Sequence, residues 1–168
     1  MSERSVAPGG LALVESLVNT LDLESGGDTL GTAEGRARFG LTEDDVPAAR
    51  DLRESLRAAL LAHAGHPPHR EVTPLGELLA AAPLLVAVDA RDGSARLAPA
   101  DSGPLLSRVA AAVAEALVAG TWDRLKACEG TTCHWAYYDR SPAGRGRWCS
   151  MQVCGARAKM RRYRAKGA

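Results

Sequence analysis

Hydrophobic residues recur every three or four positions along much of the first 120 residues, the spacing of helices with one buried face. This pattern predicts helices over residues 11–20, 42–64, 73–82 and 104–119. The expected buried positions are Leu11, Val14, Leu17, Val18 and Leu21 in the first helix, Val46, Ala49, Leu52, Leu56 and Leu60 in the second, and Leu105, Leu106, Val109, Val113, Ala116 and Leu117 in the last.

Two other segments of this part do not have helical spacing. Residues 84–89 and 95–98 alternate around an Asp92-Gly93 turn, which predicts a β-hairpin. Residues 22–40 hold five glycines and no sustained period, so we expect a long loop. The predicted fold class of residues 1–120 is therefore mainly α with one small β-hairpin.

The charge distribution divides the chain in two. Residues 1–120 carry ten Lys and Arg against seventeen Asp and Glu, a net −7, whereas residues 121–168 carry eleven against three, a net +8. Six of the seven aromatic residues also follow residue 120. We therefore expect an N-terminal domain over 1–120 and a small basic module over 121–168, of the kind that meets a polyanion.

All four cysteines lie in the basic module: Cys128, Cys133, Cys149 and Cys154. Two C-x4-C pairs joined by fifteen residues can surround one tetrahedral zinc ion, and about 45 residues cannot bury enough core to fold alone. The alternatives are two disulfides or four unrelated buried cysteines. No signal peptide is evident, and a cytoplasmic protein rarely keeps structural disulfides. His134 could replace one ligand, but we interpret it as a hydrogen-bonding neighbour.

The segment after Cys154 is rich in helix formers and cations. We expect a terminal helix whose apolar face, Ala156, Met160 and Tyr163, packs on the zinc module, with Ala158 and Ala165 toward solvent. The candidate nucleic-acid contacts are Arg145, Arg147, Arg157, Lys159, Arg161, Arg162, Arg164 and Lys166. An inert, solvated basic tail is the alternative, and Arg147 and Arg157 could instead balance the charge of the thiolates.

Two tryptophans, three histidines and the Asn19-Thr20 pair can each be interpreted as structural or as part of a binding site. Trp135 and Trp148 are expected to form a miniature core rather than to stack on bases. His63, His66 and His69 are interpreted as a solvated connector rather than a metal site. Asn19 and Thr20, before the glycine-rich loop, could cap the first helix or line a small-molecule pocket.

The C-terminal residues also resemble a known family. The motifs are Leu125-Lys126-Ala-Cys128, His134-Trp135-Ala-Tyr137-Tyr138, Arg145-Gly-Arg147-Trp148-Cys149 and Cys154-Gly-Ala-Arg157. Over residues 124–166 they resemble the CGNR zinc finger of bacterial proteins, and residues 11–20 more weakly resemble the start of the domain that usually precedes it. The resemblance implies a stress-induced transcription regulator that binds DNA. Ala156 stands where the family has its namesake Asn.

These features together predict a two-part transcription regulator in the cytoplasm. A zinc-stabilised α+β module ending in a basic helix would bind DNA, and the helical domain would sense a small-molecule effector or mediate homodimerisation. The alternatives are a module that docks an acidic protein and an RNA-binding protein. We expect no enzyme, since no catalytic motif is found and a closed four-thiolate zinc has no open position. No segment reaches the roughly 20 apolar residues of a membrane span.

Overall fold

A computed structural model describes residues 6–166 of the chain. Two antiparallel hairpins pair β1 (Leu84–Val88) with β2 (Ala95–Pro99) and β3 (Leu125–Ala127) with β4 (Ala136–Tyr138). The α-helices are α1 (Leu11–Val18), α2 (Ala33–Ala37), α3 (Val46–His63), α4 (Leu75–Leu79), α5 (Leu105–Val118) and α6 (Ala156–Lys166). The 3₁₀ helices η1 (Thr29–Gly31) and η2 (Trp122–Arg124) and the π-helical turn η3 (Met151–Gly155) complete the described part of the fold. The predicted fold class is confirmed.

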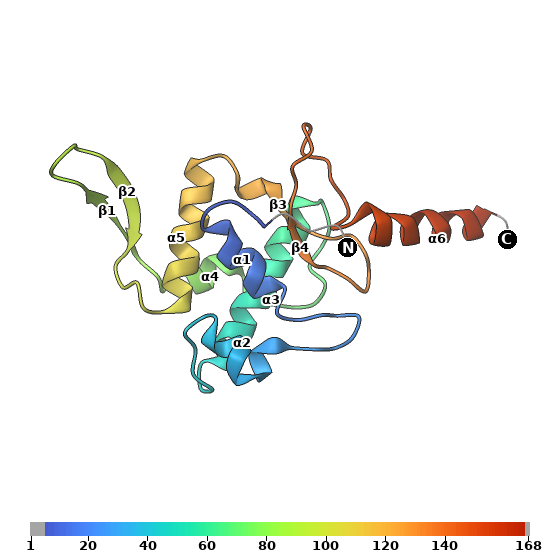
Figure 1. Cartoon of the computed structure of the whole chain (residues 1–168), viewed down its shortest axis with the longest axis horizontal. Helices are drawn as coiled ribbons and strands as arrows, with labels where there is room; N and C mark the ends of the chain where they lie inside the picture. The colour runs from blue at the N-terminus through green and yellow to red at the C-terminus, as the bar shows by residue number, and fades with distance from the viewer. Residues whose placement is uncertain (1–5, 167–168) are drawn as a thin grey trace.

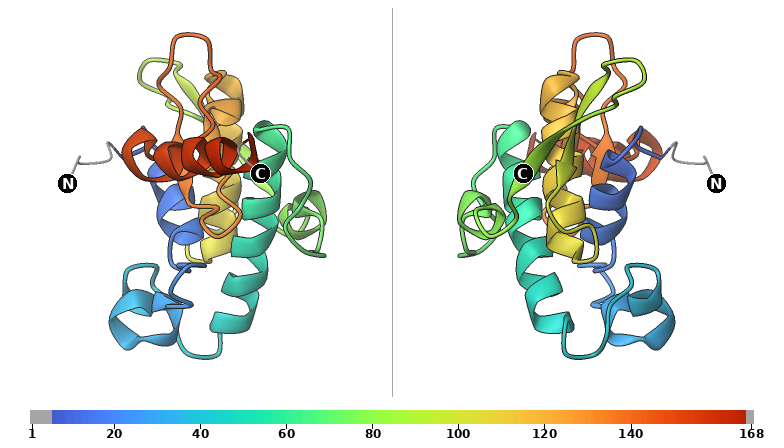
Figure 2. Two further views of the ribbon diagram at one scale, coloured as in Figure 1. Left: turned by 90° about the vertical axis from the view of Figure 1, so that its right-hand side faces the viewer. Right: turned by 90° about the vertical axis from the view of Figure 1, so that its left-hand side faces the viewer.

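Helices α1, α3 and α5 lie side by side and enclose the main core (Figures 1 and 2). Val14 and Leu17 of α1, Leu56 and Leu60 of α3, and Val109 of α5 are fully buried. These residues occupy the positions that helical spacing predicted, because i, i+3, i+4 and i+7 fall on one face. None of the helices over residues 6–166 is long and apolar enough to cross a bilayer.

The β3–β4 hairpin belongs to the same core although it lies beyond residue 120. Leu125 and Ala127 are 0% exposed and Ala136 is 1% exposed, and all three pack with the helical core residues. A side-chain amide strengthens the junction: Asn19, which caps α1, donates to the Ala136 carbonyl at 3.0 Å and accepts from its N–H at 2.7 Å. The hairpin thus starts the C-terminal module on a surface that the helices provide.

Three local predictions are corrected. Residues 22–40 are not all loop, since η1 and α2 form there, with Asp28 and Thr32 side chains capping them. Helix α3 begins at Val46 rather than near Thr42, because the Asp45 carboxylate accepts from the Thr42 N–H and hydroxyl and holds that segment in a turn. Leu117 is 59% exposed rather than buried, so the buried face of α5 ends at Ala116, which is 4% exposed.

Helix α3 buries charged residues that lie outside its predicted apolar face. Arg57 is 0% exposed and donates to the carbonyl of Val18, at the end of α1, and to that of His134, each at 2.8 Å. Glu54, 1% exposed, accepts from both Arg53 and Arg57. A buried charge is tolerated only when it is paired. This network therefore fixes α3 against α1 and against the C-terminal module.

Two elements extend away from the body of the molecule. The β1–β2 hairpin projects beyond α5 at one end, and α6 projects at the opposite end (Figure 1). The two projections therefore offer separate surfaces to any partner.

We predict that Leu125→Ala lowers the free energy of unfolding by about 2–5 kcal/mol, because it opens a cavity in the core shared by the helices and β3. Leu85→Ala is the matched control, since Leu85 is 57% exposed. Urea denaturation followed by far-UV circular dichroism measures both. A loss in Leu125→Ala no larger than in the control would show that β3 does not contribute to the common core.

Candidate metal centre and nucleic-acid interface

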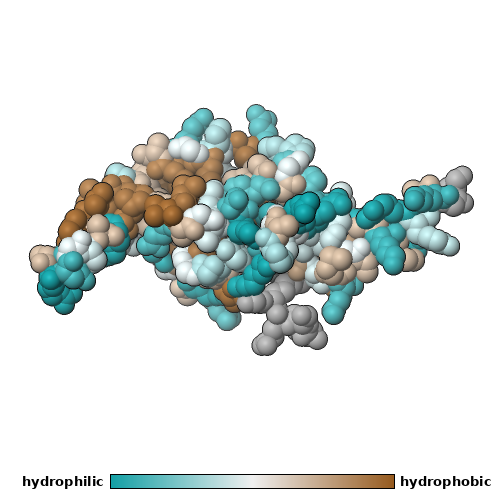
Figure 3. All heavy atoms as spheres, turned by 90° about the horizontal axis from the view of Figure 1, so that it is seen from above, coloured by the Kyte–Doolittle hydropathy of each residue, from teal (hydrophilic) through white to brown (hydrophobic). Residues whose placement is uncertain are grey.

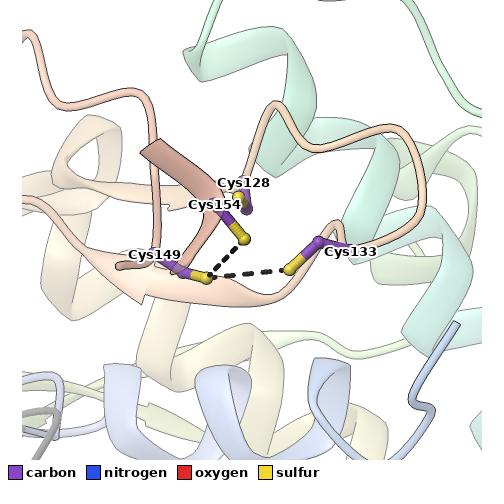
Figure 4. A group of neighbouring side chains, drawn as sticks. All are labelled: Cys128, Cys133, Cys149 and Cys154. Atoms are coloured by element: carbon purple, nitrogen blue, oxygen red, sulfur yellow. Dashed lines mark hydrogen bonds between the residues drawn. The ribbon is translucent and has the colours of Figure 1, made fainter. Parts of the chain in front are cut away.

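The four cysteines converge from separate parts of the module. Cys128 follows β3, Cys133 lies in the loop before β4, Cys149 follows the arginine-rich turn, and Cys154 lies in η3. Their sulfur atoms all lie within 4.8 Å of one another (Figure 4). Cys133 Sγ is 3.6 Å and Cys154 Sγ is 3.8 Å from Cys149 Sγ.

These separations fit zinc. Ligands at about 2.3 Å from a tetrahedral zinc ion lie about 3.8 Å from one another. The same distances exclude disulfides in this arrangement, since an S–S bond is about 2.05 Å long, and all four cysteines are free. Because four protein ligands complete the shell, the ion would cross-link the loops. The predicted cofactor, one structural zinc, is confirmed.

Short local bonds aim the sulfurs at the centre. The Cys133 N–H donates to the Gly130 carbonyl at 2.8 Å, closing a turn, and the Cys128 N–H donates to the Trp135 carbonyl at 2.9 Å. A Cβ on Gly130 would lie 3.1 Å from the Cys133 Cβ, so the turn favours glycine. At the second pair, the Ser150 hydroxyl accepts from the Val153 N–H and starts η3, which carries Cys154 inward.

The close contacts among the four thiols shift their pKa values in different directions. Hydrogen bonds from the Cys133 and Cys149 thiols lower the pKa of Cys128. The same contacts with Cys128 raise the pKa values of Cys133 and Cys149, and burial raises the pKa of Cys154. One thiolate thus suppresses ionisation of its neighbours, and a divalent cation would allow all four to ionise.

The residues around the cluster have the roles that were predicted for them. His134 is no ligand: its Nδ1 lies 3.0 Å from the Cys128 carbonyl oxygen, and its backbone has a positive φ of 46°. Trp135 and Trp148 pack against the buried cysteines, as expected of a miniature core.

The turn over residues 142–146 is held by buried polar groups that sequence reasoning missed. The Asp139 carboxylate, 4% exposed, accepts from Lys126 Nζ at 3.0 Å and from the N–H groups of Ser141 and Gly146. A Cβ on Gly146 would lie 2.7 Å from this carboxylate, so the turn requires glycine there. Although burial opposes ionisation, these hydrogen bonds hold the pKa of Asp139 well below its usual range. Arg124 donates to the Ser141 carbonyl at 2.6 Å.

All eight predicted nucleic-acid contacts are exposed. Two of them form ion pairs: Arg147 with Glu129 at 2.6 Å, and Arg157 with Glu24 at 2.8 Å. Glu129 raises the pKa of Arg147, and Glu24 raises the pKa of Arg157. The nearby sulfurs of Cys154 and Cys133 also raise the pKa of Arg157, which agrees with the charge-balancing role considered for it. The other six have no ion-pair partner within residues 6–166: Arg145, Lys159, Arg161, Arg162, Arg164 and Lys166.

The predicted packing of α6 is wrong. Met160 is 52% and Tyr163 77% exposed, whereas Ala158 is buried at 8%. Helix α6 meets the module through its first turn and then projects outward, because η3 sets its direction from Cys154 (Figure 1). All residues over 159–166 are exposed, so the rest of the helix is open to solvent.

Asn19 and Thr20 border a shallow hollow of about 410 Å³ between the end of α1, the loop that follows it and the C-terminal module. Trp135 also lines this hollow. The Asn19 amide is bonded to Ala136, and the Thr20 hydroxyl donates to Leu17 and accepts from Arg53. Both residues therefore have the structural role that was considered for them, and both also line a hollow.

The interpretation of the three histidines as a solvated connector is wrong. His63 Nδ1 lies 2.7 Å from the Leu125 carbonyl oxygen, His66 lies 3.2 Å from a Glu129 carboxylate oxygen, and His69 lies 2.9 Å from one of Glu54. The end of α3 and the segment that follows it therefore lie against the body of the molecule, where the three rings meet these partners.

The structure thus joins a helical domain to a four-cysteine, zinc-finger-like module that ends in an exposed basic helix. The family comparisons agree. Residues 11–120 match the model described as "Putative stress-induced transcription regulator", and residues 124–167 match the CGNR zinc finger. The chain belongs to this family of regulators with a CGNR zinc finger. No curated protein matches it.

We predict one zinc per purified chain and none in Cys149→Ser, because three thiolates leave the shell open. The helical domain should stay folded, while order is lost over the loops that carry the cysteines. Ser102→Ala, at an exposed position in the helical domain, is the control and should keep its zinc. Elemental analysis with circular dichroism measures both properties, and a zinc-free wild type with ordered loops would contradict the site.

We predict that Asp139→Asn destabilises the protein by about 3 kcal/mol, because Lys126 keeps a buried charge without its partner. Asp123→Asn, at an exposed position nearby, should change stability by less than about 0.5 kcal/mol. Thermal unfolding in excess zinc compares the two. Equal stabilities would show that the Asp139 contacts do not support the turn.

Proposed function

We propose that this protein is a non-enzymatic transcription regulator that binds duplex DNA through α6 and the turn over residues 142–146. The observation that carries the proposal is the set of six exposed cations without ion-pair partners on these two elements, within the described part of the chain. Phosphate contacts from Lys and Arg supply most of the sequence-independent affinity of DNA-binding proteins.

The shape of α6 supports this proposal. Its last turns are exposed, and a helix of 11 residues is about 17 Å long and narrow enough for the major groove. Arg161 and Arg164 border an open apolar surface formed with Met160 and Val153. Cations would contact phosphates while the apolar residues approach thymine methyl groups.

The structural zinc would hold this helix in position. Cys154 is a ligand in η3, and α6 begins two residues later, so the ion is linked to the basic helix by a very short segment. Asp139 and Arg124 fix the second basic element in the same module.

For the N-terminal domain we propose regulation, by an effector bound in the hollow beside Asn19 or by homodimerisation. An effector in the hollow would touch both the end of α1 and the finger residue Trp135. It would thus be able to alter the contact between the two parts. A stress-related signal and a cytoplasmic location belong to this proposal.

We predict that replacing Arg161, Arg162 and Arg164 together with Gln weakens binding to duplex DNA and reduces the slope of log K against log salt by about 2.7, or 0.9 for each lost phosphate contact. The matched control replaces Arg38, Arg70 and Arg91 with Gln, which removes the same charge from exposed positions elsewhere. Fluorescence anisotropy from about 50 to 200 mM salt measures the slopes.

Equal slopes in the two triple variants would contradict a role for α6. Tighter binding to single-stranded RNA than to duplex DNA would favour the RNA alternative. Binding to an acidic protein but to no nucleic acid would favour the protein-interaction alternative.

A further inference from the structure

An apolar surface remains exposed at the end of the molecule opposite α6. Val86 and Val88 of β1 are 69% and 62% exposed, and Leu117 and Val118 at the end of α5 are 59% and 81% exposed. The hairpin and the helix enclose an apolar hollow of about 380 Å³. The corresponding apolar area is seen over the projecting hairpin in Figure 3.

The outer edge of β1 is available for pairing. Strand β2 lies between β1 and α5, and β1 pairs only with β2 among the described residues (Figure 1). The Asp89 N–H donates to the Ser94 carbonyl, and the Ala100 N–H donates to the Pro83 carbonyl. In an antiparallel pair, every second residue forms such bonds to the partner strand and the residues between them do not. The backbone groups of Leu84, Val86 and Val88 therefore point away from β2.

The other edge is blocked. Pro99, opposite Leu84, has no N–H to donate, and α5 lies on that side of the hairpin. A two-stranded hairpin is marginally stable in water, and an open apolar edge invites another strand. The β1 edge is thus the one suited to accept a partner.

We propose that β1 pairs with β1 of a second copy of this chain, antiparallel about a two-fold axis at Val86. Val86 would face Val86 of the copy, and Leu84 would face Val88, giving about six new backbone hydrogen bonds. A four-stranded sheet would result, with one apolar face. The inference rests on the homodimerisation option of the proposed function and does not require DNA binding.

The charge of this surface favours a second copy as the partner. Strands β1 and β2 and the last turn of α5 carry only Arg96 and Glu115, so two copies meet without net repulsion. The other exposed apolar stripe, on α6, lies among six cations and would repel its copy.

The chain also departs from a compact shape. It exposes 10026 Å², whereas a compact monomer of 17.6 kDa exposes about 7,900 Å². The β1–β2 hairpin and α6 are the two projections that contribute to this difference (Figure 1). Of the two, the hairpin is the one whose exposed apolar side chains, Val86 and Val88, lie on a strand with a free edge.

Sedimentation of the full zinc-loaded chain tests the proposal. The wild type should be a dimer at about 100 µM, and Val86→Lys should weaken dimerisation at least about ten-fold because it places a charge on the edge. Val86→Pro should do the same, since it removes only an outward N–H. Val6→Lys is the matched control, since Val6 is an equally exposed valine outside the hairpin (62%), and it should stay dimeric.

A monomeric wild type, or a dimer that survives both Val86 substitutions, would overturn the proposal. Zinc content and circular dichroism confirm that each variant is folded. Duplex binding is measured on the same variants: a monomeric Val86→Lys that still binds DNA non-specifically supports both claims, whereas a dimeric wild type that binds no DNA supports the dimer and contradicts the DNA claim alone.

Discussion

Four thiols brought within 4.8 Å of one another form the constraint on which the C-terminal module depends. Without a cation, ionisation of one thiol suppresses that of its neighbours, so the loops would be joined only by weak contacts. A zinc ion converts this crowding into four strong bonds. The loops around it contribute little apolar burial of their own, so metal binding supplies much of their folding free energy.

The module is joined to the helical domain by polar as well as apolar contacts. Arg57 reaches the carbonyl of His134, beside Cys133, from within α3, and Asn19 pairs with Ala136 as a neighbouring strand would. These bonds connect α3 and the end of α1 to the start of β4. The hollow beside Asn19 is therefore connected to the cysteine cluster by a short chain of hydrogen bonds.

The features that depend on local patterns could be predicted from the sequence. Cysteine spacing identified the ligands, and helical periodicity identified α1, α3 and α5, because both follow from neighbours along the chain. The burial of Arg57 and Glu54 was missed, since charged residues within a helix normally face solvent. The outward direction of α6 was missed as well: its apolar stripe suggested packing, but η3 sets its direction through contacts that spacing does not reveal.

The central claim is that the metal positions the basic helix for DNA. The most direct measurement is a zinc titration of metal-free protein, with duplex binding followed by fluorescence anisotropy. Tight binding should appear with the first equivalent of zinc and should not increase with more. Metal-free protein that binds the duplex as tightly as the zinc-loaded form would contradict it.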